Sequence, residues 1–525
     1  MYFLILFFSI LTGNYAYNIL VYSPSFGASH TNFMARIADT LTDARHNVTF
    51  LVPVVDKTRK TQLGVKTTKD VVMVENHDGS FVDKGAGTYW AAEINAGNIY
   101  ELFGEFAIAM NNNCHDFLQR KDIFEEMKSR NFDVGIFEPL TVCGLGFMHA
   151  IGIRKIITAC SEVFYDTVLD VIGEPLDLSH VPTILSTLED PEKWSFSDKI
   201  QNYKLSMAYQ KWTYEVFDAQ TTIYKKYLGE EVPDWRELIA KSSLQFVNSI
   251  PYVDFPRTVG QKTISIGGIQ VGSQIEDLEE EWDAVLSARP MNVLISFGSV
   301  VRSMDLPEVW RNPNMSRSNL LAAIKSQPNT TFIWKYESDD LSFAQGFPNI
   351  HFSKWVPQTS LLNDPRLTAF ITHGGLGSTN ELSYHGVPAI MVPVFVDQHR
   401  NSNMLARHGG VIVFKKQDLG DADKIKNALQ AILYDEKYKK NSMKLAELLN
   451  NQPLKPREQV VRYVEFVARF GPFPNMDMEG RGLGLLEKNV LDIYFVLVAP
   501  YLFGLGLVFL VTLVMLLRVR SVKIQ

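Results

Sequence analysis

The chain has 525 residues, of which 46% are hydrophobic and 21% are charged, and its formal net charge is −7. This length exceeds what a single hydrophobic core usually supports, so we expect two domains and additional segments. The composition is typical of a globular protein and excludes a disordered chain. The negative charge argues against nucleic acid as a partner, because phosphate binding requires a basic surface.

An apolar segment, YFLILFFSIL, directly follows Met1. It is about as long as the hydrophobic region of a signal peptide and too short to span a bilayer. Since GNYAY follows it, we expect residues 1–16 to be a signal peptide that is cleaved after Ala16. A buried first strand is the alternative, because no Lys or Arg precedes the segment.

Short runs rich in β-branched residues alternate with helical stretches along the first half of the chain. The predicted strands cover residues 18–22, 47–52, 132–137, 155–158 and 245–248. Ser29 is the predicted cap of a helix whose apolar stripe comprises Phe33, Met34, Ile37, Ala38 and Leu41. This alternation predicts an α/β domain with a parallel sheet.

After an acidic stretch that begins at Ile275, the same alternation restarts at Asn292. Its predicted strands cover residues 292–299, 331–335, 350–352, 367–372, 389–393 and 411–414. We therefore expect two doubly wound Rossmann-like domains, over residues 17–275 and 285–455, followed by a return helix and neck over residues 456–490. Ligands of such folds bind at the carboxyl ends of the strands, so the site should be the cleft between the domains.

The motif ITHGGLGSTNE, residues 371–381, is the turn from one predicted strand into a helix. Glycines allow close approach to backbone amides, and a helix N-terminus attracts phosphate. His373 adds a hydrogen-bond donor, and Glu381 could bind a diol such as ribose. The motif thus favours a nucleotide, and a tight turn with a capping serine and no ligand is the alternative.

Residues 493–517 near the C-terminus carry no charge. As a helix they would reach about 37 Å, which is enough to cross the hydrocarbon core of a bilayer. The tail at residues 518–525 contains Arg518, Arg520 and Lys523, so the positive-inside rule places it in the cytosol. With a signal peptide, this predicts a single-pass type I protein whose bulk is lumenal, and we expect the endoplasmic reticulum membrane.

Three N-glycosylation triplets agree with a lumenal location, although such triplets also occur by chance. They begin at Asn47, Asn314 and Asn329. The cysteines are Cys114, Cys143 and Cys160, which are too few for a disulfide framework and leave at least one unpaired. No CxxC or Cys/His cluster suggests a metal site.

The flanks of the glycine-rich motif extend it to WVPQTSLLNDPRLTAFITHGGLGSTNELSYHGVPAIMVPVFVDQ, residues 355–398. This span closely resembles the signature of the UDP-glycosyltransferases, and specifically the membrane-bound UDP-glucuronosyltransferase type. Phe255-Pro-Arg257, Gly267-Gly268 and residues 296–299 extend the resemblance. It implies the GT-B fold, with a UDP-sugar as co-substrate on the C-terminal domain and no cofactor or metal.

The resemblance also implies roles for individual residues. Trp355 would stack on uracil, and Gln358 and Glu381 would bind the ribose hydroxyls. Asp397 and Gln398 would bind the sugar, and Arg257 would reach the carboxylate of glucuronic acid. The diphosphate would be held by His373, Ser299, Gly375, Gly377, Ser378 and Thr379. Gly377 departs from the family, which often has Asn there, so a side-chain contact to phosphate is missing.

Inverting glycosyl transfer needs a base to deprotonate the acceptor hydroxyl. By resemblance to the N-terminal Ser-His motif of the family, His30 is that base, and an imidazole with an ordinary pKa of about 6.5 suits the task. A structural histidine is the alternative. Glu138 occupies the position where the family has the aspartate that orients the base, and Asp133 is the less favourable competitor at the other end of the strand.

Other features leave alternatives open. Asp421-Ala-Asp423 matches the DxD pattern of metal-dependent glycosyltransferases, but helix capping explains it better. The acceptor pocket should lie between residues 60 and 212, and its candidate lining, which could equally be core, comprises Phe103, Phe106, Met110, Phe117, Phe147 and Met148.

The first hypothesis for function is a membrane-anchored enzyme that transfers glucuronic acid or glucose to a hydroxyl of a small lipophilic acceptor. Its expected partners are UDP-glucuronate or UDP-glucose, the acceptor and the membrane, with a homo- or hetero-oligomer left open. The second hypothesis, motivated by Glu138 and Gly377, is a weak or inactive family member that binds UDP-sugar or a sister subunit as a regulator.

Overall fold

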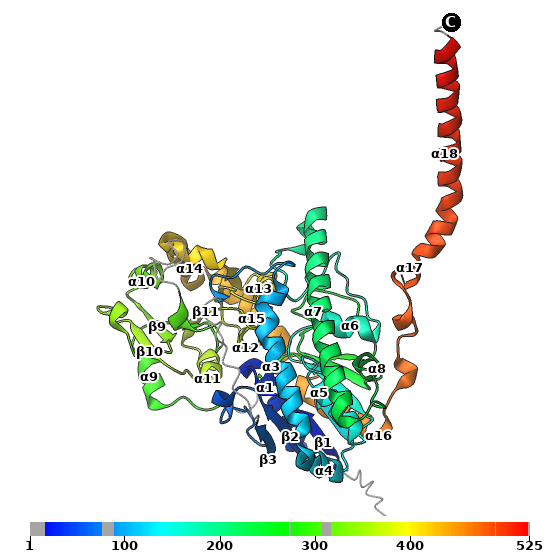
Figure 1. The fold of residues 1–525 in the computed structure, drawn as a ribbon. Coiled ribbons are helices and arrows are strands. Elements are labelled where there is room, and N and C mark those ends of the chain that lie inside the picture. Colours follow the sequence, from blue (N-terminus) through cyan, green and yellow to red (C-terminus); the bar gives the residue numbers. More distant parts are fainter. Residues whose placement is uncertain are drawn as a thin grey trace, which may run out of the picture.

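The computed structural model describes residues 16–75, 89–271, 275–299, 301–306, 317–488 and 490–522. Two parallel β-sheets with surrounding helices form the body, and one long helix projects from it (Figure 1). Most of the predicted signal peptide, Asn314 and the last three residues of the basic tail lie outside the described residues. The two doubly wound α/β units confirm the predicted fold class.

The first sheet has seven parallel strands within the described residues, in the order β3–β2–β1–β4–β5–β6–β7. The strands are β1 (Asn18–Tyr22), β2 (Asn47–Val54), β3 (Asp70–Glu75), β4 (Val134–Phe137), β5 (Ile156–Cys160), β6 (Leu244–Val247) and β7 (Thr263–Ser265). The helices of this half are α1 (Ala28–Asp43), α3 (Ile99–Gln119), α4 (Lys121–Ser129), α5 (Cys143–Ala150), α6 (Asp166–Ile172), α7 (Phe196–Leu228) and α8 (Trp235–Ala240).

The second sheet, over its described part, has six parallel strands in the order β10–β9–β8–β11–β12–β13. They are β8 (Met291–Ser296), β9 (Thr330–Lys335), β10 (Ile350–Ser353), β11 (Leu367–Thr372), β12 (Ala389–Met391) and β13 (Val411–Val413). The helices are α9 (Glu280–Ser287), α10 (Arg317–Lys325), α11 (Gln358–Asn363), α12 (Leu376–His385), α13 (Gln398–Ala406), α14 (Ala422–Tyr434) and α15 (Glu436–Asn450). In each sheet the chain first adds strands on one side of the first strand and then crosses over to its other side. Folds of this type bind ligands in the crevice at that crossover point.

Helix α1 begins one residue before the predicted cap. Gly27 is the N-cap, with an extended backbone and no side-chain hydrogen bond, so the assignment of Ser29 as cap was wrong. The apolar stripe of the helix is buried as predicted. Because α1 starts at Ala28, His30 lies in its first turn, directly beyond the carboxyl end of β1.

The capping explanation of Asp421 is confirmed. Its Oδ1 accepts hydrogen bonds from the backbone amides of Asp423 and Lys424, each at 3.0 Å. The carboxylate therefore satisfies two of the free N–H groups at the start of α14.

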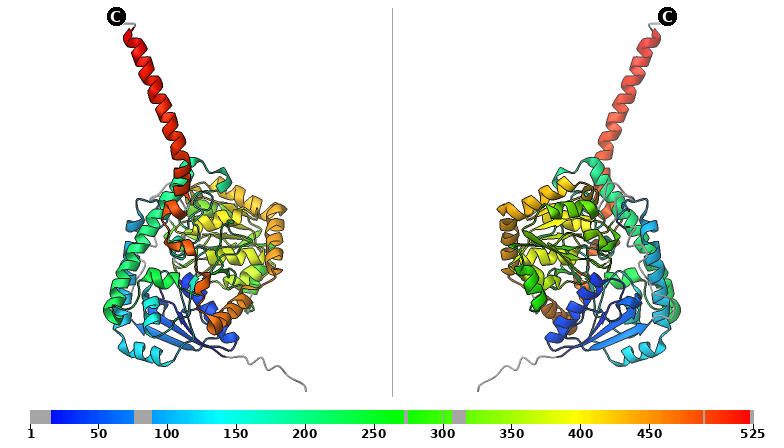
Figure 2. Two further views of the ribbon diagram at one scale, coloured as in Figure 1. Left: turned by 90° about the vertical axis from the view of Figure 1, so that its right-hand side faces the viewer. Right: turned by 90° about the vertical axis from the view of Figure 1, so that its left-hand side faces the viewer.

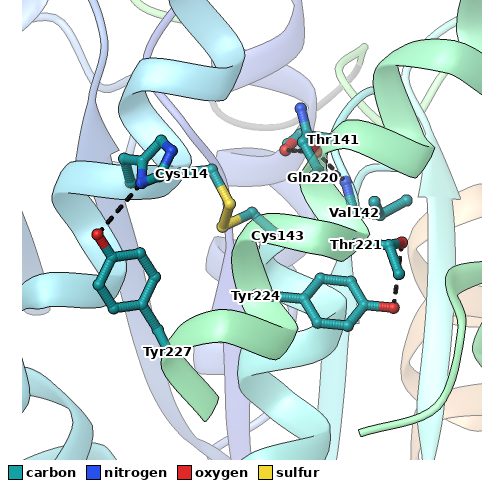
Figure 3. Close-up of a disulfide and its surroundings, with 9 residues drawn as sticks. Cys114, Thr141, Val142, Cys143, Gln220, Thr221, Tyr224 and Tyr227 are labelled. Carbon is teal, nitrogen blue, oxygen red and sulfur yellow. Dashed lines mark hydrogen bonds between the residues drawn. A yellow bond between two sulfur atoms is a disulfide. The ribbon is translucent and has the colours of Figure 1, made fainter. Parts of the chain in front are cut away.

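A disulfide joins Cys114 of α3 to Cys143 at the start of α5, and Cys160 is a buried free cysteine. Figure 3 shows that the bond lies beside α7, where Gln220 accepts hydrogen bonds from the Thr141 hydroxyl and the Val142 amide, both at 2.8 Å. Helices α3 and α7 lie side by side (Figure 1). The disulfide and these bonds thus fix the loop after β4 against the long helices.

Helix α16 (Pro456–Phe470) returns from the second half of the chain to the first sheet. Val460, Val464 and Val467 are fully buried there, in one cluster with Ile19 and Phe33. Burying each valine contributes about 1.5–3 kcal/mol relative to leaving it exposed. Helix α16, which follows the second half of the chain, therefore packs on the first sheet and links the two halves.

Beyond the short α17 (Leu485–Lys488), helix α18 (Leu491–Val522) extends away from the body in every view (Figure 2). Within it, 27 residues from Leu491 to Leu517 are long and apolar enough to cross a membrane, and none of that window is buried in the protein. Pro500 lies inside the helix. An exposed apolar helix of this length is what the predicted span requires.

A buried ion pair joins the two halves at the residues that precede Arg257. Arg400 Nη2 of α13 donates to Asp254 Oδ1 at 2.7 Å, and the two side chains are 2% and 3% exposed. The guanidinium groups of Arg400 and Arg407 lie 5.2 and 4.9 Å from the ring of Phe255. The Phe-Pro-Arg segment thus forms part of the contact between the sheets' two domains.

Candidate active site

A cavity of about 710 Å³ lies between the two sheets and takes its lining from both halves of the chain. Loops after β1, β4, β5 and β6 face it from the first half, and loops after β8, β10, β11 and β12 face it from the second, together with Lys335 at the end of β9. The predicted site residues in its wall are His30, Ser299, Trp355, Gln358, His373, Gly375, Gly377, Ser378, Glu381, Asp397 and Gln398. Glu138, Thr379 and Arg257 do not line it.

Glu138 lies directly behind His30. His30 Nδ1 is 2.8 Å from Glu138 Oε1, and Glu138 is only 2% exposed. Asp133, the competing carboxylate, instead accepts a hydrogen bond from the Asn18 amide at 2.8 Å. Since β1 and β4 are neighbours, their carboxyl ends bring His30 and Glu138 together across 108 residues.

Ser161, which sequence reasoning missed, completes this cluster. Its Oγ lies 2.7 Å from His30 Nδ1, and its hydroxyl donates to Glu138 Oε1. Its backbone amide donates to the same oxygen at 3.3 Å. With Nδ1 engaged in this way, Nε2 is the imidazole nitrogen left for a ligand in the cavity.

The carboxylates around His30 change its ionisation. Burial opposes the charged imidazole, but the charge and hydrogen bond of Glu138, with smaller effects from Glu162 and Asp397, raise the pKa of His30 to about 9. The expectation of an ordinary imidazole pKa is therefore corrected. His30 is a stronger base than a free histidine, and it holds its proton at neutral pH.

Helix α12 points its N-terminus at the cavity. Its N-cap is Gly375, which has no side chain to bond the first amides, and Gly377 and Ser378 of the first turn line the cavity. His373 sits beside them. A Cβ on Gly298 or on Gly375 would lie 2.7 Å from the His373 ring, and Gly298 has φ of +92°, so both positions need glycine.

Lys335, at the end of β9, is a cation that sequence reasoning missed. Its Nζ donates to the Gly298 carbonyl at 2.6 Å and lies 5.6 Å from the Trp355 ring. Burial, together with the charge of Lys335, lowers the pKa of His373 to about 4. His373 is therefore a neutral hydrogen-bond donor. Positive charge near an anion comes from the N-terminus of α12 and from Lys335, whose Nζ also lies 3.4 Å from Glu337 Oε1.

A second polar cluster lies about one turn further along α12. Gln358 Nε2 donates to Glu381 Oε2 at 2.5 Å and to Ser378 Oγ at 3.0 Å, while the Thr359 hydroxyl donates to Glu381 Oε1 at 2.5 Å. Burial raises the pKa of Glu381. Trp355 stands beside this cluster with 69% of its surface exposed, so a planar base has an open aromatic face to stack on.

The loop that carries Asp397 and Gln398 is held in a strained conformation. Val396 has φ of +52°, which is unfavourable for a β-branched residue. Gln398 Oε1 accepts from the amides of Val394 and Phe395, each at 2.9 Å, and Asp397 Oδ2 accepts from Asn401 at 2.6 Å. These bonds hold both predicted sugar-binding side chains at the cavity wall.

Arg257 does not line the cavity. Its Nη2 donates to the Pro175 carbonyl at 2.9 Å, and its guanidinium lies over the Phe164 ring at 4.4 Å. Burial lowers its pKa. The sequence placed Arg257 at the donor sugar because its motif resembles the family, but the structure places the segment at the domain contact instead. Thr379 likewise turns inward, where its hydroxyl donates to the Gly375 carbonyl at 3.1 Å.

One side of the cavity, where the sequence predicts the acceptor pocket, is aromatic. Of the six predicted lining residues, Phe103 and Phe106 face the cavity, and Met110, Phe117, Phe147 and Met148 are core. Sequence reasoning missed the other apolar lining residues on this side, which are Phe26, Tyr89, Leu102, Leu140, Tyr209, Trp212 and Phe395. Apolar spacing alone could not separate cavity wall from core, because both are hydrophobic.

Comparison with known proteins agrees with the geometry. The family model described as "UDP-glucoronosyl and UDP-glucosyl transferase" matches residues 18–522. The "Putative UDP-glucuronosyltransferase ugt-47" of Caenorhabditis briggsae is 28% identical over 507 residues, which cover 93% of this chain and 90% of the relative. "UDP-glucuronosyltransferase 3A1" of Bos taurus is 28% identical over 489 residues, covering 89% and 88% of the two chains.

Solved structures of glycosyltransferases share the fold. Glycosyltransferase VinC in complex with DTDP superimposes with a TM-score of 0.59 at 17% identity, over 86% of this chain and 100% of that one. The glycotransferase of kitacinnamycin gives 0.57 at 15% identity, over 86% and 98%. The chain is therefore a glycosyltransferase of GT-B fold that belongs to the UDP-glucoronosyl and UDP-glucosyl transferase family.

Proposed function

We propose that the protein transfers a hexosyl group from a UDP-sugar to a hydroxyl of a small lipophilic acceptor, with inversion at the anomeric carbon. The observation that carries this proposal is the 2.8 Å contact between His30 Nδ1 and Glu138 Oε1 at the wall of a cavity that α12 closes from the other side. It supplies a base on one side and an anion-binding helix terminus on the other.

In the proposed mechanism, the neutral form of His30 accepts the proton of the acceptor hydroxyl at Nε2. The oxygen attacks the anomeric carbon, and the bond from that carbon to the UDP oxygen breaks on the opposite face. Glu138 stabilises the imidazolium that forms and holds Nδ1 in the protonated tautomer. Ser161 supports the same geometry through its bonds to both partners.

UDP is proposed to lie along α12. The amides of Gly377 and Ser378, the neutral His373 and the cation of Lys335 would hold the diphosphate and stabilise the charge that develops as it leaves. Ser299 would add a hydroxyl from the facing loop. Uracil would stack on Trp355, and the ribose hydroxyls would bind Gln358 and Glu381, which are already positioned by mutual bonds.

For the sugar, we favour a neutral hexose. Asp397 lines the cavity, where a glucose hydroxyl would donate a hydrogen bond to it. Arg257 lies outside the cavity wall, so its guanidinium is not placed to pair with the carboxylate of glucuronic acid. We therefore expect UDP-glucose to be used better than UDP-glucuronate, which reverses the preference that Arg257 suggested.

We also propose that the two domains bind different substrates. Residues 17–275 would bind the acceptor, residues 285–455 would bind UDP-sugar, and residues 456–490 would return to the first domain and lead to the membrane. The packing of α16 on the first sheet supports this arrangement.

For location, we propose a type I endoplasmic reticulum membrane protein with its body in the lumen. The disulfide is typical of an oxidising compartment. Asn47 and Asn329 are exposed, as glycosylation requires, and basic residues Arg518 and Arg520 follow the apolar part of α18.

The experiment is UDP release by the full-length protein in detergent, with UDP-glucose and UDP-glucuronate in parallel against lipophilic alcohols. Turnover that requires both substrates supports the proposal. Bound UDP-sugar without turnover, for every acceptor that binds, would favour the regulatory hypothesis. Glu138 no longer motivates that hypothesis, because the longer carboxylate reaches His30 at hydrogen-bond distance.

A further inference from the structure

Glu162, which follows β5 and Ser161, is a cavity residue that the proposed mechanism does not use. It lines the cavity, and its Oε2 is shielded from solvent without a hydrogen-bond partner among the described residues. Its backbone carbonyl is engaged with the Asn248 amide at 3.2 Å, so its main chain is fixed. Burying a carboxyl oxygen without a hydrogen-bond partner costs free energy, and a ligand that donates a hydrogen bond to Glu162 would remove that cost.

The surroundings of Glu162 are aromatic. The rings of Tyr209 and Trp212 are stacked with centroids 5.6 Å apart, and Phe103 lies 5.3 Å from Trp212 and 5.8 Å from Phe395. All four line the cavity. Burial and then the charge of Glu162 raise the pKa of the Tyr209 phenol, which places the carboxylate close to this wall.

Glu162 shares the cavity with Asp397 and His30, and the ionisation of its carboxyl group responds to both. Burial and the nearby Asp397 raise the pKa of Glu162 to about 8, and His30 opposes this effect only in part because Glu138 adds negative charge as well. At neutral pH this carboxyl group is therefore largely protonated until a bound cation lowers its pKa. Arg36 and Lys66 also line the cavity, but they pair with Asp39 and Glu276. A carboxylate and aromatic faces together are the chemistry that recognises an organic cation.

We propose that the acceptor carries a protonated amine, which Glu162 binds while the aromatic wall surrounds its apolar part and its hydroxyl reaches His30. This inference rests on the proposed function, because it names the class of acceptor for the same site. The substrate class is a lipophilic, hydroxyl-bearing amine. The ammonium supplies the counter-charge that Glu162 lacks, and it is not the reacting group.

A different role for Glu162 makes a different prediction. If Glu162 stayed protonated and donated a hydrogen bond to a neutral acceptor, a charge on the ligand would bring no gain in affinity. If it bound a sugar hydroxyl beside Asp397, its replacement would weaken UDP-glucose and not the acceptor. Both alternatives can be tested with the same variants.

The experiment measures binding of tyramine and of 4-propylphenol to the full-length protein in detergent by calorimetry, with UDP present, at pH 8.5, where Glu162 is ionised and the amine is still protonated. The two ligands share a phenol and differ in an ammonium against a methyl group. We expect the wild type to prefer tyramine by roughly 10- to 100-fold, and Glu162→Gln to reduce the preference below about threefold. Glu162→Asp, which keeps the charge, should retain part of it.

Glu105→Gln is the matched control, because Glu105 is an exposed carboxylate on α3, the helix that carries Phe103. It should leave the tyramine preference intact. Equal affinity of the wild type for both ligands would overturn the inference, as would an equal loss for both ligands in Glu162→Gln. The readout needs no turnover, so a failure of the proposed catalysis would appear separately, as absent UDP release with intact amine binding.

Discussion

Replacing Glu138 by Gln separates the charge of this residue from its hydrogen bond to His30. Glutamine has the same length, and its side-chain oxygen can still accept from Nδ1, so the tautomer is kept. The charge is lost. The shift of the His30 pKa from 6.5 to about 9 corresponds to about 3 kcal/mol at roughly 1.4 kcal/mol per unit. Burial acts in the opposite direction, so the variant should titrate near or below 6.5.

The two enzymes should therefore have different pH profiles. The form that accepts a proton is the neutral imidazole, so wild-type kcat/KM should rise about tenfold per pH unit up to about pH 9 and then level off. Glu138→Gln should be flat above neutral pH, at a plateau roughly tenfold below that of the wild type, because a less basic imidazole removes the proton less well. The profiles should cross at about pH 8.

The assay is UDP release with an aliphatic alcohol as acceptor. A phenol is unsuitable, because its own ionisation near pH 10 would distort the alkaline limb. The quantity to compare is kcat/KM, since it reports ionisations of the free enzyme. If kcat/KM of the wild type and of Glu138→Gln rose with pH over the same range, the claim that the charge of Glu138 sets the ionisation of His30 would be refuted.

Three further substitutions test other parts of the structure. Asp254→Ala leaves Arg400 buried without its partner, so the free energy of unfolding should fall by about 3–5 kcal/mol in denaturant titrations, and a change below 1 kcal/mol would contradict the importance of this contact. Lys335→Met should weaken UDP binding by roughly tenfold in calorimetry and let the pKa of His373 rise towards its ordinary value. Unchanged UDP affinity would remove Lys335 from the site. Gly377→Asn should fold normally, because a Cβ there would meet only Gln270 Oε1 at 3.5 Å, and it should bind UDP several-fold more tightly, whereas weaker binding would contradict the placement of the diphosphate.

The donor side of the site could be predicted because its signal is local. Within a few residues around His373, a strand ends, a glycine turn follows and a helix begins. This order alone predicts a helix N-terminus that can bind an anion. The doubly wound fold was equally accessible, because strand and helix periods alternate along the whole chain. The pairing of His30 with Glu138 was predicted from resemblance and is the result of β1 and β4 being neighbours.

The residues that the sequence missed have no local signature. Ser161 and Glu162 follow an ordinary buried strand, and only the adjacency of β4 and β5 brings them to His30. Lys335 ends a strand in the way that many surface lysines do. For Arg257, a motif that resembles the family predicted a ligand contact, whereas the structure places the side chain outside the cavity wall with a bond to Pro175. The ionisation of His30 also depends on charges from three loops, which no single segment reveals.

The most direct test of the account compares wild-type protein with His30→Ala for both UDP-sugar binding and UDP release. Loss of a general base should lower kcat by about 100- to 10,000-fold, while affinity for UDP should be unchanged because its proposed contacts lie on the second domain. That combination would establish His30 as the base at a separately formed donor site. Equal turnover by the two proteins would contradict the central claim.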